Sequence, residues 1–426
     1  MERTVAFCTL GCKVNQYETE ALKELFGNNG FIISDFEDFC DIYVINSCTV
    51  TATGDKKSRS AVSRARRKNE NAVIALIGCY AQHLTDKEKE TIKADIILGN
   101  GEKNSLLSLV KSNLKIKDAK DVMEYKEFED TSISGTASDR ARGYIKIQDG
   151  CNRYCSYCII PYVRGKVRSR PLQSIENEAK RLSENGIREI VLTGIQVGAY
   201  GDDFDKGISL IDAIEATARA KAVKRIRLSS IEPVAITEEF LQRVSKIPAF
   251  CFHFHLSLQS GCDKILKAMN RRYTTKEYLS KVNLIRKYFP YSAITTDIIA
   301  GFPGETEEDF NETLCFAEKC GFSKIHAFPY SKRDGTKAAL LKDLPARHIR
   351  NERAKKLIDL SERMSNEFLQ DNLGKEQEVY VEKFTDGYCF GYTSNYIYLK
   401  VKSDKDLTGQ TIKLTLSKEL ISSEEE

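Results

Sequence analysis

Apolar and polar residues alternate in blocks along the N-terminal quarter of the chain, and the blocks predict strands separated by helices. Short apolar runs predict buried strands at residues 5–9, 42–47, 72–77 and 96–98. Amphipathic segments predict helices at residues 18–26 and 53–68. Such a βαβα order is typical of a parallel sheet covered by helices. We therefore expect an N-terminal parallel α/β domain over residues 1–112.

This pattern is lost at residues 113–139, which are rich in Lys, Asp, Ser and Thr and predict a linker. A second alternating series follows over residues 140–371. Its strands are expected at residues 144–148, 189–193, 225–229, 253–258, 294–299 and 324–328, and its amphipathic segments lie at residues 210–219, 237–244, 277–288 and 307–319. Six β/α units predict an open, partial barrel of the TIM type, with its reactive groups at the C-terminal ends of the strands.

The hydrophobic period changes twice more towards the C-terminus. Residues 347–371 have the period of one long helix with a single buried face. Beyond it, residues 379–381, 388–392, 396–401 and 411–416 alternate between apolar and polar side chains. This alternation predicts a small antiparallel β-barrel over residues 372–426. The expected fold class is therefore α/β, with a parallel cluster domain, a partial (β/α)6 barrel and a small C-terminal β-barrel.

Composition adds limits on location and partners. With 41% hydrophobic and 30% charged residues, the chain resembles ordinary soluble proteins. No apolar run approaches the roughly 18–20 residues that span a bilayer, and the first residues lack the features of a signal peptide. We therefore expect a cytoplasmic protein without a membrane partner. Thirteen cysteines in such a protein indicate metal binding rather than disulfides, and a net charge of +4 is compatible with an anionic polymer as partner.

Three cysteines form a compact C-x3-C-x2-C motif directly after the first predicted barrel strand: Cys151, Cys155 and Cys158. Thiolates are the preferred ligands of iron–sulfur clusters, and a 4Fe–4S cluster has four irons, so three thiolates leave one iron open. The alternatives are a zinc site or buried thiols. Structural zinc usually has four ligands in two close pairs, and no fourth partner lies nearby in the sequence.

Three further cysteines are far apart in the sequence but occupy equivalent positions. Cys12, Cys48 and Cys79 each follow the end of a predicted strand of the N-terminal domain. The loops after the strands of an open parallel sheet converge at one edge, so these thiols can meet there as a second metal site. The alternative is that each is an isolated buried residue, because free cysteine is often buried. Spacing alone leaves both interpretations open.

The motifs around both triads resemble a known family. The C-x3-C-x2-C motif, with Tyr157 before its last cysteine, is the signature of radical S-adenosylmethionine enzymes. The segments TLGCKVNQYET (residues 9–19), NSCTVT (46–51) and GCYAQ (78–82) resemble the three cysteine motifs of the methylthiotransferases in that superfamily. The resemblance covers essentially the whole chain and implies two 4Fe–4S clusters, one on each triad, and a C-terminal TRAM domain that usually binds RNA.

The resemblance also implies a reaction and its partners. One S-adenosylmethionine methylates a sulfur, and a second is cleaved to a 5′-deoxyadenosyl radical that removes hydrogen from an unactivated carbon, where the methylthio group is delivered. Residues 10–19 resemble the MtaB branch, which acts on carbon 2 of N6-threonylcarbamoyladenosine beside the anticodon of tRNA. The implied partners are tRNA, an electron donor such as flavodoxin or ferredoxin, and a sulfur source.

Three alternatives accompany this interpretation. The MiaB branch acts on isopentenyladenosine in tRNA and tends to have Gly-Cys-Gln-Met-Asn at the first motif. The RimO branch acts on an aspartate of a ribosomal protein. An RNA-binding electron carrier would use clusters without chemistry on the nucleic acid, but it would leave the open iron unexplained.

The resemblance further implies contacts with S-adenosylmethionine at the strand ends. Backbone carbonyls beside a glycine can receive an ammonium group, and a carboxylate suits ribose hydroxyls. The expected contacts are Tyr157, Thr193, Gly194, Glu232, Ser257, Gln259, Gly301, Phe302 and Pro303. Polar residues at strand ends and Gly-Pro turns are common, however, and each position can equally be structural.

Substrate contacts are expected in four places. Lys57 and Arg64 belong to a basic helix after Cys48 that can neutralise RNA phosphates or simply face solvent. Asn15 and Gln16 follow Cys12, and Arg168 lies in a basic segment after the second motif. The C-terminal domain also has alternating aromatic residues that can stack on bases or form its core. These residues are Tyr388, Phe390, Tyr392, Tyr396 and Tyr398.

Overall fold

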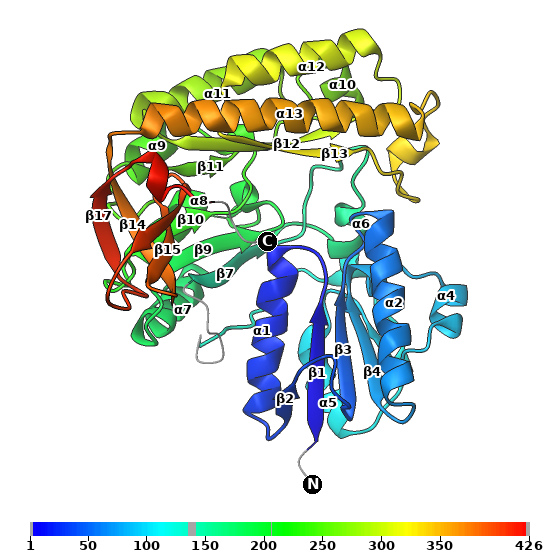
Figure 1. The fold of residues 1–426 in the computed structure, drawn as a ribbon. Helices are drawn as coiled ribbons and strands as arrows, with labels where there is room; N and C mark the ends of the chain where they lie inside the picture. The colour runs from blue at the N-terminus through cyan, green and yellow to red at the C-terminus, as the bar shows by residue number, and fades with distance from the viewer. Residues whose placement is uncertain (1–2, 135–141, 206, 423–426) are drawn as a thin grey trace.

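The computed structural model describes residues 3–134, 142–205 and 207–422 and confirms the α/β class (Figure 1). Six parallel strands form the N-terminal sheet in the order β2-β1-β3-β4-β5-β6. Its strands are β1 (Thr4–Thr9), β2 (Ile32–Ser34), β3 (Ile42–Ser47), β4 (Val73–Gly78), β5 (Ile96–Leu98) and β6 (Ile116–Lys117). Its helices are α1 (Lys13–Gly27), α2 (Ala52–Lys68), α3 (Cys79–His83), α4 (Asp86–Thr91) and α5 (Leu106–Lys111).

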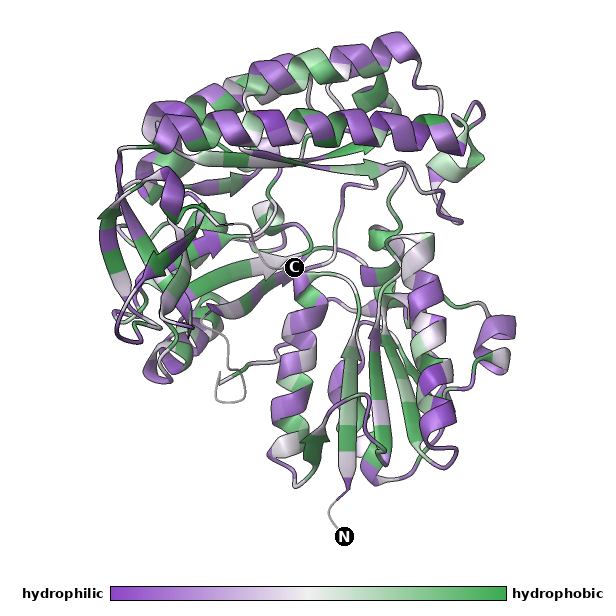
Figure 2. Ribbon diagram, viewed as in Figure 1, coloured by the Kyte–Doolittle hydropathy of each residue, from purple (hydrophilic) through white to green (hydrophobic). Residues whose placement is uncertain are grey.

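The central strands of this sheet are buried on both faces, as is usual for parallel sheets. Every residue of β3 is buried, and so are five of the six residues of β4. Figure 2 shows these strands mainly in the colour of hydrophobic residues, whereas α2 is mixed. Only a narrow stripe of small residues on α2 is buried, namely Ser58, Ala61, Val62 and Ala65, and most of its basic residues are exposed.

Two features of this domain differ from the sequence-based expectation. The helix α1 begins at Lys13, five residues earlier than predicted, because it buries the polar residues Asn15 and Glu18, which hydropathy does not mark as inward-facing. The strand β6 and the buried Val122 lie in the segment that was predicted to be only a linker. The predicted end of that linker at residue 139 lies outside the described residues.

The second part of the chain is the predicted partial barrel. Its strands are β7 (Arg142–Asp149), β9 (Glu189–Gly194), β10 (Arg225–Leu228), β11 (His253–His255), β12 (Ala293–Ala300) and β13 (Lys324–Pro329). They are parallel in this order. The bridge Ile226–Phe250 joins β10 to the segment before β11, and the bridge Ile231–Leu256 joins the segments that follow the two strands. The short strand β8 (Arg168–Ser169) pairs antiparallel with β7.

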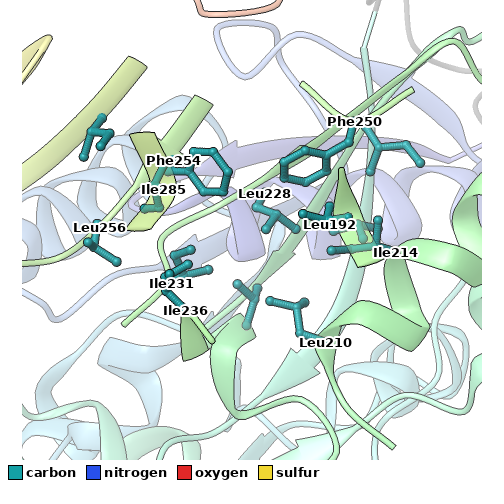
Figure 3. Close-up of a cluster of buried hydrophobic side chains, with 14 of the residues drawn as sticks. Leu192, Leu210, Ile214, Leu228, Ile231, Ile236, Phe250, Phe254, Leu256 and Ile285 are labelled. Atoms are coloured by element: carbon teal, nitrogen blue, oxygen red, sulfur yellow. The ribbon is translucent and has the colours of Figure 1, made fainter. Parts of the chain in front are cut away.

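Helices cover the outside of the barrel. They are α7 (Leu172–Glu184), α8 (Leu210–Ala218), α9 (Glu238–Val244), α10 (Asp263–Ala268), α11 (Thr275–Tyr288), α12 (Glu307–Cys320) and α13 (Arg347–Asn372). The short helix α6 (Ile160–Arg164) instead packs against the N-terminal domain, where Val163 lies in one buried cluster with Cys79. The apolar residues between strands and helices, such as Leu228, Phe254 and Ile285, form the largest buried cluster of the described chain (Figure 3). The long helix α13 adds Leu357, which is buried against the same cluster.

The C-terminal part is an antiparallel sheet that curls into a half-barrel in the order β16-β15-β14-β17. Its strands are β14 (Glu376–Thr385), β15 (Tyr388–Thr393), β16 (Tyr398–Lys402) and β17 (Thr411–Thr415). Arg225 and Arg227 of β10 both donate hydrogen bonds to the carbonyl of Thr393, each at 2.7 Å. The half-barrel is thereby attached to the start of the barrel strands. Within the described residues, no helix combines the length and apolarity that crossing a membrane requires.

The barrel core gives the first testable prediction. Phe254→Ala removes a side chain with 0% exposure from the main cluster, so we expect a loss of about 3–5 kcal/mol in the free energy of unfolding. Phe252→Ala, two residues earlier and 42% exposed, is the matched control and should cost under about 1 kcal/mol. Thermal unfolding monitored by circular dichroism compares the two midpoints, and equal midpoints would contradict this description of the core.

Candidate active site

Cys12, Cys48 and Cys79 lie at the C-terminal ends of β1, β3 and β4, and the close approach of their loops depends on a glycine. Cys12 precedes α1, and Cys79 is the first residue of α3. Gly11 has a φ of 95°, and a Cβ atom at this position would lie 2.7 Å from both Cβ and Sγ of Cys48. Only glycine allows the two loops to approach this closely.

The chemistry of this triad suits an iron–sulfur cluster. All three cysteines are free thiols, with Cys12 exposed and the other two buried. Burial, with smaller contributions from the thiols of Cys79 and Cys12, raises the pKa of Cys48 to about 11. The three sulfurs do not all lie within 4.8 Å of one another. A cluster binds each thiolate to a different iron and therefore accepts wider spacing than a single zinc ion.

The second triad lies on the loop after β7. Gly150 has a φ of 72°, and a Cβ atom there would lie 1.8 Å from the carbonyl oxygen of Lys166, so the turn into this loop requires glycine. Cys151 Sγ lies 3.4 Å from Gln196 Oε1, and Cys155 Sγ accepts a hydrogen bond from Arg271 Nη1 at 3.3 Å. Burial raises the pKa of Cys158 to about 12. The loop thus gathers three thiols at the C-terminal end of the barrel, as predicted.

Glu232, a predicted cofactor residue, contacts side chains in and beside this loop. Its carboxylate pairs with Arg153 Nε at 2.7 Å and with Arg271 Nη1 at 3.0 Å, and it accepts a hydrogen bond from Gln196 Nε2 at 2.7 Å. Glu232, Arg271 and Cys155 line one cavity of about 100 Å³. The structure therefore brings Glu232 together with the second triad, through Gln196 and Arg271.

The remaining predicted cofactor residues lie at the ends of the barrel strands. Thr193 and Gly194 end β9 beside Gln148, and Ser257 follows β11. Gln259 has a φ of 71°, and its N–H donates a hydrogen bond to the carbonyl of Asp297 at 2.8 Å. The turn Gly301, Phe302 and Pro303 follows β12, and Phe302 packs in one buried cluster with Tyr157. Direct contact of these residues with a cofactor stays a prediction.

A buried group of charged residues connects the two triads. Arg164 Nη1 lies 3.0 Å from Glu18 Oε1 and 3.1 Å from both carboxylate oxygens of Asp149. Lys146 Nζ donates to Glu18 at 2.8 Å and to Asp149 at 2.6 Å, and Lys103 also pairs with Glu18. Burial opposes the ionisation of Glu18, but the three cations hold its pKa well below the usual value. We call these five residues the interdomain charge network.

Two predicted substrate contacts are corrected by this arrangement. Asn15 is 1% exposed, and its amide donates to the carbonyls of Leu10 and Ser47 while its oxygen accepts from Arg164. Arg168 is 3% exposed and donates to the carbonyls of Arg164 and Lys166. Both side chains are buried and hydrogen-bonded within the protein, so neither is available to a substrate in this structure. Sequence gives no signal of burial for such polar residues.

The other three predicted substrate residues are accessible. Gln16 is partly buried near the start of α1, and Lys57 is exposed on α2. Arg64 is exposed on α2 as well, where it pairs with Glu37 at 3.1 Å. The basic face of α2 therefore stays a candidate surface for RNA phosphates.

Sequence reasoning did not identify three residues that contact the site. Gln196 and Arg271 touch the second triad, as described above. Arg333 Nη2 donates to Thr49 Oγ1 at 2.7 Å and pairs with Asp55 at 2.7 Å, next to Cys48. These residues lie in loops without a motif of their own. Only the position of Gln196, just after a barrel strand, was a usable signal.

Comparisons with known proteins agree with this geometry. The model of the Radical SAM superfamily matches residues 145–317, and that of Uncharacterized protein family UPF0004 matches residues 4–99, so each contains one triad. The chain is 40% identical to threonylcarbamoyladenosine tRNA methylthiotransferase MtaB of Bacillus subtilis (strain 168), over 97% of this chain and 94% of that protein. It is 32% identical to tRNA-2-methylthio-N(6)-dimethylallyladenosine synthase of Finegoldia magna, over 96% and 91%.

A solved structure shares the fold. The radical S-adenosylmethionine methyltransferase TsrM from Kitasatospora setae, solved with cobalamin and a 4Fe–4S cluster, matches with a TM-score of 0.57 and 16% identity. The match covers 77% of this chain and 75% of that chain. At this identity the similarity shows the fold alone.

The two triads predict a specific iron content. We expect the reconstituted protein to hold about eight irons, in two clusters of four, and Cys48→Ala to hold about four because its other triad is intact. Cys389→Ala, which removes a buried thiol from the C-terminal half-barrel, is the control and should leave the iron content unchanged. Colorimetric iron assays measure both. An iron content of about eight in Cys48→Ala would refute the cluster on the N-terminal triad.

Proposed function

The chain belongs to the tRNA methylthiotransferases of the radical S-adenosylmethionine superfamily, and we propose that it methylthiolates carbon 2 of N6-threonylcarbamoyladenosine beside the anticodon of tRNA. MtaB relatives are 36–40% identical to this chain and dimethylallyladenosine synthases 32–36% identical, which supports threonylcarbamoyladenosine over isopentenyladenosine as the substrate base. The protein is an enzyme that works with 4Fe–4S clusters and S-adenosylmethionine.

The observation that carries this proposal is the placement of two cysteine triads on either side of one buried charge network. Sulfur insertion needs two reactive groups close to one substrate atom. Glu18 joins the helix that follows Cys12 to Lys146 and Arg164 of the barrel, and Asp149 lies two residues before Cys151. The network therefore holds the two triads together from both domains.

Each triad has a role in this proposal. Cys151, Cys155 and Cys158 hold the cluster that binds S-adenosylmethionine, and Cys12, Cys48 and Cys79 hold the cluster that presents sulfur. When bound, the clusters supply the electron for cleavage of S-adenosylmethionine and the site of sulfur delivery. The protein contributes the thiolates, positions the substrates and excludes water. Proposed contacts of S-adenosylmethionine are Tyr157, Thr193, Gly194, Glu232, Ser257, Gln259 and the turn at Gly301, Phe302 and Pro303.

The proposal assigns a role to each part of the chain and to several residues that contact tRNA. Residues 1–112 form the cluster domain, 113–139 the connection, 140–371 the radical barrel with its long helix, and 372–426 the TRAM-like part that binds RNA. The exposed basic residues of α2, including Lys57 and Arg64, lie just after Cys48 and contact tRNA phosphates, and Gln16 contacts the substrate beside Cys12. A cytoplasmic location, a reductant such as flavodoxin or ferredoxin, and a sulfur source complete the proposal.

Nucleoside mass spectrometry tests the substrate. Cells without this gene should lose the 2-methylthio form of threonylcarbamoyladenosine from tRNA and keep the unmodified nucleoside, and the intact gene should restore it. Cys12→Ala should fail to restore it, because the N-terminal triad is then incomplete. Loss of the 2-methylthio form of isopentenyladenosine instead would overturn the proposed substrate and favour the second branch.

Cleavage of S-adenosylmethionine separates the roles of the two triads. With dithionite, Cys48→Ala should still form 5′-deoxyadenosine, at a rate within a few-fold of the unchanged protein, because its barrel triad is intact. Cys155→Ala should form none, because that triad then lacks a thiolate. Liquid chromatography of the quenched mixtures measures the product. An unchanged yield from Cys155→Ala would remove the basis of the radical mechanism.

The basic face of α2 predicts salt-dependent binding of tRNA. Lys57→Ala should weaken binding and lower the slope of log K against log salt by about 1, because one phosphate contact is lost. The control Lys221→Ala changes an exposed lysine of the barrel, beyond α8, and should leave the slope unchanged. Fluorescence anisotropy with labelled tRNA at several salt concentrations provides the slopes. The same slope for Lys57→Ala as for the unchanged protein would exclude this face.

A further inference from the structure

Arg164 is a fully buried arginine that touches the N-terminal triad from the barrel side. It is the last residue of α6, six residues after Cys158, and has 0% exposure. Its Nε donates a hydrogen bond to Cys79 Sγ at 3.3 Å. Its Nη2 donates to Asn15 Oδ1 at 2.7 Å, three residues after Cys12. The guanidinium therefore contacts one predicted cluster ligand and the helix that follows another.

The other face of the same guanidinium is held by the interdomain charge network. Nη1 lies 3.0 Å from Glu18 and 3.1 Å from Asp149, so the orientation of Nε towards Cys79 is set on both sides. Five donor hydrogens in a rigid planar group make arginine suited to such simultaneous contacts. A lysine at this position could not reach the sulfur and both carboxylates in the same way.

The charges of the network do not balance by themselves. Its three cations, Lys103, Lys146 and Arg164, pair with the carboxylates of Glu18 and Asp149, and all five side chains are at most 5% exposed. Arg168 adds a fourth buried cation 3.9 Å from Asp149, and Glu129 adds a third carboxylate that acts on Lys103 and Lys146 without an ion pair, so one cation remains in excess. A buried charge without a counterion is costly, so an excess cation indicates an anionic neighbour. A 4Fe–4S core with three thiolates is such an anion, and reduction makes it more negative. The residues present therefore fit a cluster at Cys12, Cys48 and Cys79.

We propose that Arg164 is the positioning residue of the N-terminal cluster, which holds the thiolate of Cys79 and sets the reduction potential of that cluster from the barrel domain. The inference rests on the proposed assignment of a cluster to this triad. Hydrogen bonds to the sulfurs and nearby charge are two of the factors that set cluster potentials. Because the guanidinium stabilises the reduced, more negative cluster, it raises the potential.

The barrel triad has a comparable arginine. Arg271 Nη1 donates to Cys155 Sγ at 3.3 Å and pairs with Glu232, and its side chain is 6% exposed. Each triad thus has one buried arginine that is bonded both to a cysteine sulfur and to a carboxylate. Arg271 is the matched control for Arg164, since it carries the same charge and the same kind of sulfur contact at the other site.

The test measures the N-terminal cluster alone. The full-length chain with Cys151, Cys155 and Cys158 all changed to alanine should bind about four irons, and its midpoint potential follows from a dithionite titration monitored by electron paramagnetic resonance. In this background, Arg164→Gln should shift the midpoint to a more negative potential. Arg271→Gln should leave the midpoint where it was. Equal midpoints for Arg164→Gln and its parent would overturn the inference.

For a second variant, we expect the midpoint potential to shift in the opposite direction. Asp149→Asn removes a carboxylate that partly neutralises Arg164, so the midpoint should move to a more positive potential. A purely structural role of the network predicts no such reversal of sign between the two variants. If Arg164→Gln does not fold or loses its iron, the Asp149→Asn shift decides alone, and an absent or negative shift overturns the inference. Circular dichroism and iron content establish that each variant is folded and loaded.

The outcome also separates this inference from the proposed function. A parent chain that folds but binds no iron would refute the cluster at Cys12, Cys48 and Cys79, and the proposed function with it. A parent that binds about four irons but shows the same midpoint in every variant would refute only the role of Arg164. Opposite shifts of the midpoint potential for Arg164→Gln and Asp149→Asn, with no shift for Arg271→Gln, would support both the cluster at this triad and the role of Arg164.

Discussion

The ion pairs of Glu18 with Lys103, Lys146 and Arg164 are the interaction on which the rest of the site depends. Glu18 belongs to the helix that follows Cys12, whereas Lys146 and Arg164 lie on either side of the barrel triad. Buried ion pairs contribute little net stability, because desolvation offsets their attraction. They do fix geometry, since a displaced partner leaves an uncompensated charge inside the protein. Here the geometry that they fix is the relative position of two reactive centres.

The two sheets bring three cysteines together in different ways. In the N-terminal domain, three parallel strands each deliver one cysteine to a shared edge, and the close approach of their loops needs Gly11. In the barrel, one loop delivers all three cysteines and needs Gly150 for its turn. The first arrangement depends on the register of β1, β3 and β4. The second depends only on local chain geometry.

The basic segment after the barrel triad shows how burial changes the meaning of a charge pattern. Arg164, Arg168 and Arg170 are each at most 3% exposed, although they lie close together in a segment that hydropathy marks as solvent-facing. Arg170 pairs with Glu178 of α7. These arginines hold elements together, whereas basic residues of α2 such as Lys57 are exposed to solvent, where a large anion can reach them. Exposed basic residues can neutralise RNA phosphates, whereas buried arginines cannot reach them.

The sequence by itself determined the α/β class, the six barrel strands, the two cysteine triads and the family, because hydrophobic period and cysteine spacing are local properties of the chain. It also placed Glu232 at the end of β10. Tertiary structure alone decided that Asn15 and Arg168 are internal, that Arg271 belongs to the site, and that Arg164 reaches Cys79. The partners of a buried polar side chain come from distant segments, so no local pattern records them.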